Sequence, residues 1–244
     1  LLGRTDGCCG YFPVLQRNGA RFEAANAYLR PVKNHPRLAL RTGMHVRRVI
    51  LNGNEAAGIE TQQGNNSETF RAGKGVVLCS GVFETPRILQ CSGIGPSEIL
   101  RAAGIPAQID LPGVGANFHD HVRVGMLYQT GRTSPGSRRN WVAGLVRYLL
   151  HRDGVMASNC CESGAFFCSR PSLAVPDIEL ITHFQTFGPK GEVDIEVCLV
   201  TPKSRGRIFV NPNDPFGLPL VDANFLAHED DMAALAAAVR RVQS

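Results

Sequence analysis

The sequence predicts an α/β portion that contains a β-meander, followed by an α+β portion in which helices cover an antiparallel sheet. Three observations indicate this fold class. Short apolar segments alternate with Gly and Asn turns before residue 75, an apolar run and two short helices follow at 76–104, and strands with alternating apolar residues dominate after residue 121.

Composition limits the size and the partners of the protein. The 244 residues are 43% hydrophobic and 19% charged, which is typical of one large or two ordinary globular domains. The net charge is only +5 and Lys and Arg are scattered, so we expect no nucleic-acid partner. No apolar run approaches the roughly 18 to 20 residues of a membrane span, so we expect no membrane-spanning helix.

Eight cysteines are present without CxxC spacing, and four of them form two adjacent pairs. They are Cys8, Cys9, Cys79, Cys91, Cys160, Cys161, Cys168 and Cys198. Neighbouring cysteines do not easily bridge each other, and structural zinc sites need a different spacing. The pattern favours free thiols in a reducing, cytoplasmic compartment.

The N-terminal third predicts one helix and a meander. In "NGARFEAANAYLRP" four apolar residues share one helical face, which should pack against a sheet, and Pro31 ends the helix. Four strand candidates follow at 38–41, 46–51, 57–61 and 69–72. The sequence "NGN" at 52–54 predicts a hairpin between the second and third candidates.

The stretch "GVVLCSGVFETPRILQCSGIG" predicts a buried strand at 76–79, a glycine gap and a short helix. Thr85 is a favourable N-cap, Pro86 suits the first helical position, and Gly93 suits the C-terminal left-handed position. A second short helix begins at Ser97 and ends at Gly104. Such a gap can receive a phosphate or an electron-rich ring, and it can equally be a tight turn without a ligand.

After residue 121 the sequence predicts the second portion. "NWVAGLVRYLLHRDG" predicts an amphipathic helix, and the segment from His228 to Arg241 predicts a covering helix with acidic residues first and basic residues last. "CCESGAFFCSR", "PDIELITHF", "GEVDIEVCLV" and "GRIFVN" predict strands of one antiparallel sheet. We place the domain boundary near residue 121, giving domains 1–121 and 122–244.

Several segments resemble one family in the same order along the chain. "GVFETPRILQCSGIG" resembles the second signature of the glucose-methanol-choline (GMC) flavoprotein oxidoreductases, and "GIPAQIDLPGVGANFHDH" resembles the segment that follows it. "ANAYLRP" and "TPKSRGRI" also fall where the family has similar runs. The resemblance, nearest to the alcohol and choline dehydrogenase branch, implies part of a Rossmann-like FAD-binding domain followed by a substrate-binding domain.

The resemblance implies FAD as cofactor and assigns four residues to it. The backbone at Val46 matches the position that holds the adenine. Ser80 and Gly81 match the small residues along which the adenosine part lies, since a Cβ there would collide with a ring. Thr85 belongs to the same signature.

The cluster His119, Asp120 and His121 is the most polar in the sequence. A metal pair needs a third ligand group, and none is evident, so we expect no metal. The resemblance places His121 near the flavin in a supporting catalytic role, and we expect the adjacent Asp120 to raise its pKa. Choline-specific members resemble one another in carrying a carboxylate where Arg123 stands, so choline is disfavoured as a substrate.

The resemblance also implies substrate-binding residues, namely Arg123, Phe166, His183 and Phe184, while a strand histidine that faces solvent is the alternative for His183. Phe166 and Phe167 alternate, so at most one of them faces the cavity. Cys161 precedes "GAF" as in fatty-acid photodecarboxylases, a branch of the family, but His183 stands where that branch has an arginine.

The implied function is oxidation of a small alcohol to an aldehyde or ketone by hydride transfer to FAD. The resemblance places the main base, a C-terminal histidine, beyond Ser244. The GxGxxG unit that holds the pyrophosphate is also expected outside these residues, in a flanking segment or a second chain. We therefore expect this polypeptide alone not to hold FAD tightly. The alternatives are a non-catalytic fragment or subunit and a photodecarboxylase-like flavoenzyme.

Overall fold

The computed structural model describes residues 7–129, 138–184 and 192–243. The chain forms two compact units, each built from separated segments. Unit 1 comprises residues 1–38, 120–203 and 226–244, and unit 2 comprises residues 39–119 and 204–225. One crossing between the units lies at 119–120, beside the expected boundary near residue 121. The division at that residue into a cofactor domain and a substrate domain stays a prediction.

Unit 2 contains the predicted meander. Strands β4 (His45–Asn52), β5 (Glu55–Gln63) and β6 (Asn66–Arg71) pair antiparallel in that order. Two-residue turns connect them, and Gly53 and Gly64 adopt φ of 58° and 57° there, a region that favours glycine. The hairpin predicted at 52–54 is therefore confirmed, whereas residues 38–41 form no strand.

Helix α1 (Gly81–Cys91) follows the meander and begins earlier than predicted. Pro86 lies inside the helix instead of at its first position, and Ser80 is the N-cap residue. The strand predicted at 76–79 is wrong, since the described chain has no strand between β6 and residue 94 and Val77 is 87% exposed. An apolar run forms a buried strand only where neighbouring strands pair with it, and none does so among the described residues.

A short parallel pair and a second helix follow α1. Strands β7 (Ile94–Gly95) and β8 (Ile109–Asp110) flank α2 (Ser97–Ala102). The two predicted glycine ends are confirmed, because Gly93 and Gly104 adopt φ of 78° and 68° just after α1 and α2. At Gly93 a Cβ would lie 2.6 Å from the carbonyl oxygen of Pro106, so a side chain does not fit.

A third small sheet completes unit 2, in the order β15 (Leu220–Asp222), β14 (Gly206–Phe209) and β9 (Ala116–Phe118). We predicted the "GRIFVN" strand, now β14, within the sheet of the second portion, and this was wrong. It pairs instead with β9, which lies before residue 121. A Cβ at Gly115 would lie 1.9 Å from the carbonyl oxygen of Ile208, so only glycine permits this close approach.

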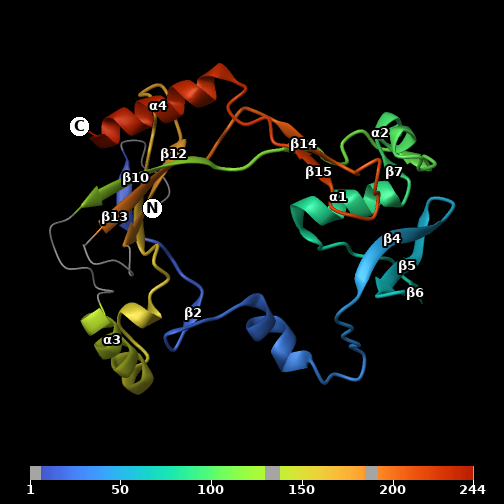
Figure 1. Ribbon diagram of the computed structural model, residues 1–244, viewed down its shortest axis with the longest axis horizontal. Helices are drawn as coiled ribbons and strands as arrows, with labels where there is room; N and C mark the ends of the chain where they lie inside the picture. The colour runs from blue at the N-terminus through green and yellow to red at the C-terminus, as the bar shows by residue number, and fades with distance from the viewer. Residues whose placement is uncertain (1–6, 130–137, 185–191, 244) are drawn as a thin grey trace. The chain divides into compact units, whose positions relative to one another are not determined.

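Unit 1 is built on a five-stranded antiparallel sheet. Its order is β1 (Cys8–Tyr11), β11 (Ser163–Phe167), β12 (Ile178–Phe184), β13 (Glu192–Leu199) and β10 (Val122–Gln129). Helix α4 (Glu229–Gln243), red in Figure 1, lies along one face of this sheet. The core between them contains Phe167, Ile178, Val197, Leu199, Leu235 and Ala238. The predicted covering helix and three of the four predicted strands are thus confirmed in one sheet.

The remaining elements of unit 1 lie outside this sheet. They are β2 (Gln16–Arg17), β3 (Ala20–Arg21), a π-helical turn Ala25–Leu29, 3-10 turns Arg30–Val32 and Val155–Ala157, and α3 (Arg138–His151). The predicted amphipathic helix is confirmed as α3. The N-terminal helix does not pack as predicted, because none of its described residues is buried and Tyr28 is 79% exposed.

Candidate functional site

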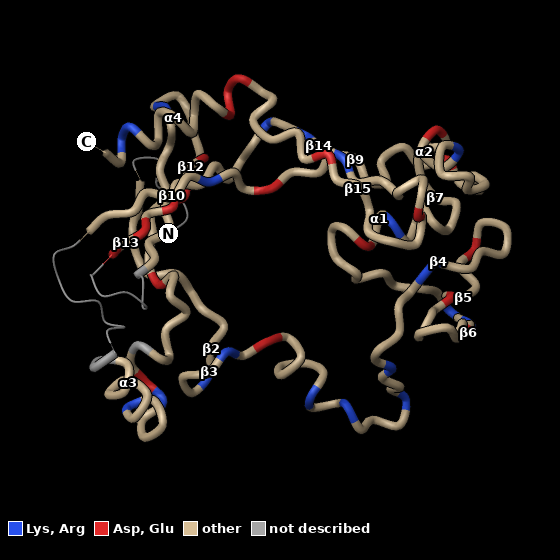
Figure 2. The backbone as a smooth tube through the Cα atoms, in the orientation of Figure 1, with Lys and Arg blue, Asp and Glu red and all other residues tan. Residues whose placement is uncertain are grey.

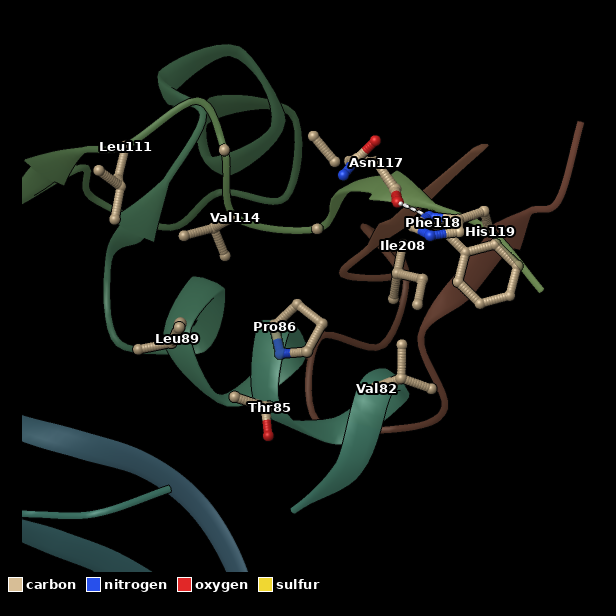
Figure 3. Close-up of a pocket in the computed structure, with 13 residues that line it drawn as sticks. Val82, Thr85, Pro86, Leu89, Leu111, Val114, Asn117, Phe118, His119 and Ile208 are labelled. Carbon is tan, nitrogen blue, oxygen red and sulfur yellow. Dashed lines mark hydrogen bonds between the residues drawn. The ribbon is translucent and has the colours of Figure 1, made fainter. Parts of the chain in front are cut away.

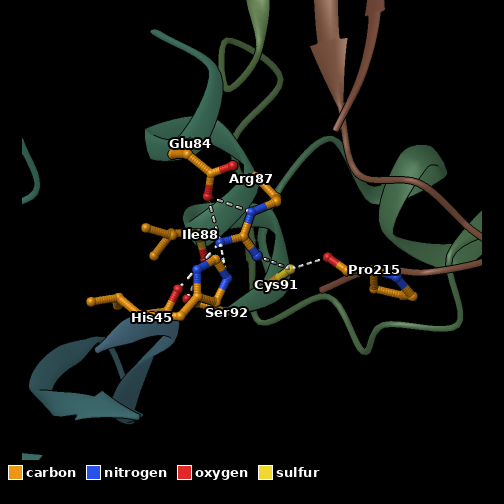
Figure 4. Close-up of polar contacts among 8 residues, drawn as sticks. His45, Glu84, Arg87, Ile88, Cys91, Ser92 and Pro215 are labelled. Atoms are coloured by element: carbon orange, nitrogen blue, oxygen red, sulfur yellow. Dashed lines mark hydrogen bonds and ion pairs between the residues drawn. The ribbon is translucent and has the colours of Figure 1, made fainter. Parts of the chain in front are cut away.

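The first candidate cluster surrounds the backbone of Val46 in unit 2. The Arg87 side chain of α1 is fully buried beside Glu84 and His45 (Figure 4). Its Nη2 donates a hydrogen bond to the Val46 carbonyl oxygen at 3.2 Å. Glu84 balances the charge, with its Oε2 at 2.8 Å from Nε and 2.6 Å from Nη2. His45 Nε2 lies 3.2 Å from the same Nη2. The guanidinium therefore fixes the start of β4 against α1.

Two further contacts tie the C-terminal half of α1 to its surroundings. The Ser92 hydroxyl accepts a hydrogen bond from the Val49 amide at 2.8 Å and donates one to the Ile88 carbonyl at 2.6 Å. Cys91 Sγ donates to the Pro215 carbonyl at 2.9 Å. Burial raises the pKa of the Cys91 thiol, although Arg87 opposes the shift, so the thiol is kept as a donor.

Ser80 and Gly81 lie at the N-terminus of α1, where backbone amides lack helical partners. Gly81 has a φ of 84°, and a Cβ built on it would meet nothing within 4 Å. The glycine is therefore required by its backbone conformation, and open space lies beside it. Open space and free amides at a helix N-terminus suit an electron-rich group.

Thr85 lines a hollow of about 570 Å³ in unit 2. The hollow is lined by Val82, Thr85, Pro86 and Leu89 of α1, by the segment 111–119 that contains β9, and by Ile208 of β14 (Figure 3). Thr85 is thus a wall residue and not the predicted N-cap. The imidazole Nδ1 of His119, at the rim, lies 2.8 Å from the Asn117 carbonyl oxygen.

Gln90 of α1 forms hydrogen bonds to two residues that line this hollow, Val114 and Ile208. The side chain is fully buried and uses both ends of its amide. Its Nε2 donates to the carbonyls of Val114 and Ile208 at 3.3 Å and 3.2 Å, and its Oε1 accepts from the Val210 amide at 2.6 Å. One side chain therefore links α1, the loop at 111–119 and β14.

The second candidate cluster is the face of the unit 1 sheet opposite α4. Strand register places Asp194, Glu196 and Cys198 on this face, while Val197 and Leu199 face the core. Figure 2 shows acidic positions of β13 in red. Burial raises the pKa of Cys198 to about 11, with smaller contributions from Glu179 and Glu196. The two faces of β13 therefore differ, with the apolar residues in the core and the acidic residues on the face opposite α4.

Arg123 and His183 share one carboxylate on that face. Arg123 Nη1 lies 2.6 Å from Glu196 Oε2, and His183 Nε2 lies 3.2 Å from the same oxygen. The Glu196 carboxylate raises the pKa of Arg123. His183 therefore does not simply face solvent, since its side chain is only 25% exposed and is held between neighbours.

Phe166 and Phe167 point to opposite faces, as their alternation predicts. Phe167 is buried beneath α4, and the guanidinium of Arg241 lies 4.7 Å from its ring centroid. Phe166 lies on the polar face and meets Phe12 edge to face with ring centroids 6.2 Å apart. Phe184 ends β12, and its side chain is outside the described part of the structure. The roles of Phe166 and Phe184 toward a substrate stay predictions.

His121 is exposed within unit 1. Asp120 Oδ1 accepts a hydrogen bond from the backbone amide of His121 at 2.8 Å. The supporting role of His121 stays a prediction. Within the described residues no group of three or more His, Cys, Asp or Glu side chains forms a metal site.

The main base expected beyond Ser244 is not among the groups that the structure brings together. Ser244 itself lies outside the described residues, which end at Gln243 in helix α4. The proton-accepting histidine therefore stays a prediction, and the two candidate clusters above are built without it.

Sequence reasoning did not find Arg87, Gln90, Glu196 or Phe12. Arg87 and Gln90 belong to the signature itself, but their partners lie far along the chain, at Val46 and Val210. Glu196 lies in the alternating strand "EVDIEV", and its polar side was the available signal. Nothing local marks Phe12.

The chain belongs to the GMC oxidoreductase family. Residues 3–123 match the N-terminal and residues 202–244 the C-terminal GMC oxidoreductase family model. Residues 124–201, which contain most of β10 and all of β11 to β13, lie between the two matches. FAD is the cofactor of this family. Most of the strands of the predicted substrate surface therefore lie outside both matches.

Similar proteins include an uncharacterised GMC-type oxidoreductase of Mycobacterium tuberculosis, 34% identical over 97% of this chain and 46% of that protein. An alcohol dehydrogenase of Pseudomonas putida is 31% identical over 95% of this chain and 44% of that protein. An oxygen-dependent choline dehydrogenase of Rhizobium etli is 33% identical over 87% of this chain and 41% of that protein. The chain spans less than half the length of these relatives.

Solved structures share the fold. A formate oxidase of Aspergillus oryzae, studied for its FAD modification, has a TM-score of 0.86 and 26% identity over 98% of this chain and 48% of that chain. Pyridoxine 4-oxidase has a TM-score of 0.80 and 26% identity over 96% of this chain and 45% of that chain. No helix in the described part of the chain is long and apolar enough to cross a membrane.

Proposed function

We propose that these residues supply the adenosine-binding edge and the substrate surface of an FAD-dependent enzyme that oxidises a small neutral alcohol to an aldehyde or ketone. The observation that supports this most is the Val46 backbone, which a buried arginine holds in a fixed position. The position that the family uses for adenine is thus preorganised by this chain's own residues.

The residues present fit the adenosine part of FAD. Gly81 leaves open space beside the α1 N-terminus, and the carbonyl of Val46 is fixed by Arg87. When bound, the flavin would supply the hydride acceptor. The chain's residues would hold the adenosine end, and the polar face of the unit 1 sheet would orient the alcohol.

The polar face favours a neutral substrate. Glu196 is already shared by Arg123 and His183, so its carboxylate is engaged and cannot readily hold a further cation. Phe12 and Phe166 offer an apolar edge on the same face. An apolar alcohol body would lie against these rings, with its hydroxyl toward the charged groups.

A substrate panel tests this choice in the complete protein that carries these residues. We expect a higher kcat/KM for medium-chain or aromatic alcohols than for choline. The matched variants are Phe166→Ala, which should weaken turnover of aromatic alcohols, and Tyr28→Ala, an exposed aromatic that should not. A preference for choline would contradict the proposal, and failure to oxidise any alcohol would contradict the reaction class.

A further inference from the structure

Four side chains of unit 1 form a continuous polar chain on the sheet face opposite α4. Cys161 Sγ lies 3.0 Å from His183 Nδ1 and 3.8 Å from His183 Nε2, so it is close to the ring as well as to Nδ1, and His183 Nε2 lies 3.2 Å from Glu196 Oε2. The same oxygen lies 2.6 Å from Arg123 Nη1. A thiol, an imidazole and a carboxylate thus stand in sequence, each within reach of the next.

This order is the general arrangement of an assisted nucleophile. A weak nucleophile contacts a base, and a third group orients that base. Glu196 Oε2 lies beside Nε2, and the tautomer that carries its proton on Nε2 would leave Nδ1 to accept the thiol proton. Arg123 in turn fixes the carboxylate through its ion pair.

Burial raises the pKa of the Cys161 thiol, and Cys160 and Glu196 add to the shift while Arg123 opposes it. The resting side chain is therefore the neutral thiol. Such a thiol reacts slowly unless a neighbouring group removes its proton, since the thiolate is the nucleophile. The adjacent imidazole is that group.

We propose that Cys161 is a covalent modification site for α,β-unsaturated carbonyl compounds, with His183 as the base and Glu196 as its positioning residue. The thiol proton passes to His183 Nδ1 while sulfur bonds to the β-carbon of the electrophile. The carbon–carbon π pair moves toward the carbonyl oxygen as an enolate, and the imidazolium then returns the proton to the α-carbon. No leaving group, oxidant or reductant is needed.

The surroundings admit a small flat electrophile. Cys161 is half-buried, and the His183 and Glu196 side chains are 25% and 14% exposed. Other charged and titratable groups share this face or flank the thiol. They are Arg123 of β10, Glu179 of β12, Asp194 and Cys198 of β13, and Cys160 and Glu162, which are next to Cys161 in the segment before β11. They are the groups that can influence the pH profile.

Labelling with N-ethylmaleimide, a conjugated carbonyl compound, tests the site without any flavin chemistry. The rate at each cysteine is followed by peptide mass spectrometry in the complete folded protein that carries these residues. We expect His183→Gln to slow labelling of Cys161 by about 10²-fold, the scale of a lost general base. Glu196→Gln should slow it less. The neighbouring exposed Cys160 should label at the same rate in every variant.

The buried Cys198 reports folding in the same experiment, because it becomes labelled only when the sheet opens. If a variant proves unfolded, the pH dependence of Cys161 labelling in the protein without substitutions tests the proposal instead. Base assistance predicts a Cys161 rate that rises across about pH 5 to 8, where imidazoles lose protons, and then levels off. A rate that keeps rising through about pH 9, where ordinary thiols ionise, or a Cys161 rate unchanged in folded His183→Gln, would overturn the proposal. Failure of the complete protein to oxidise alcohols would contradict the proposed function but not the assisted labelling of Cys161.

Discussion

Arg87 and Val46 are joined by a hydrogen bond of 3.2 Å between a fully buried guanidinium and a main-chain carbonyl. The donor lies on α1 and the acceptor at the start of β4, so the contact fixes these two elements against each other. Glu84 neutralises the guanidinium, which makes its burial tolerable. A structural ion pair thus sets the position of the Val46 backbone, whose role toward FAD stays a prediction.

Removing this guanidinium should destabilise unit 2 strongly. Arg87→Met leaves the Glu84 carboxylate and the Val46 carbonyl without their donor, at a cost of about 3 kcal/mol in unfolding free energy. The control is Arg48→Met, which breaks the exposed 2.8 Å pair with Glu60 and should cost less than about 1 kcal/mol. Urea denaturation measures both. Equal losses would mean that Arg87 is not an anchor.

Gln90 provides a second test of the same unit. Gln90→Leu keeps the volume but removes three hydrogen bonds, so the Val210 amide and the carbonyls of Val114 and Ile208 lose the partner that Gln90 supplies. We expect a loss of about 2 to 4 kcal/mol in unfolding free energy, since each orphaned group keeps its desolvation cost. Gln63→Leu, at an exposed strand end, is the control and should change little. An unchanged free energy of unfolding in Gln90→Leu would show that contacts other than those of Gln90 hold β14 in place.

The elements predicted correctly from the sequence are those set by local patterns. Asn52 to Asn54 marked a hairpin because the turn itself requires such residues, and Gly93 and Gly104 marked helix ends for the same reason. The apolar alternation of β13 fixed its two faces. These signals lie within a few residues of the feature that they predict.

The features that were missed depend on partners distant in sequence. The run at 76–79 is strand-like, yet a strand forms only with a neighbour. The partner of β14 was not predictable, because Gly115 and Gln90 decide it from positions about a hundred residues earlier. Within the candidate site, His183 was named from the sequence, but Glu196, which lies 3.2 Å from it, was not.

Cys198 predicts a decline of stability at alkaline pH. Burial raises its folded pKa to about 11, above the ordinary thiol value of 9.0. Below pH 9 the thiol is protonated in both states, so its contribution to the free energy of unfolding is fully present. Between pH 9 and about 11 the thiol ionises in the unfolded state but not in the folded state, so the free energy of unfolding falls as pH rises. Cys198→Ser should remove this part of the slope in denaturation measured across that range. An identical slope in both proteins would contradict the assignment.

His121 should support catalysis without being essential. In the complete protein, His121→Ala should keep its flavin and lose about 10- to 10³-fold in kcat, the scale of one electrostatic contribution. His151→Ala, at the exposed end of α3, is the control and should keep full activity. A loss beyond about 10⁴-fold with flavin retained would identify His121 as the general base, in place of the histidine expected beyond Ser244. An unchanged kcat would leave it without a catalytic role.

The central claim is that this chain forms part of a flavin enzyme that oxidises alcohols. The most direct measurement is anaerobic mixing of the complete protein, with FAD bound, and a neutral aromatic or medium-chain alcohol, while the visible absorbance of oxidised flavin is followed. We predict full bleaching with formation of one aldehyde or ketone per flavin. Bound flavin that no alcohol reduces would contradict the claim.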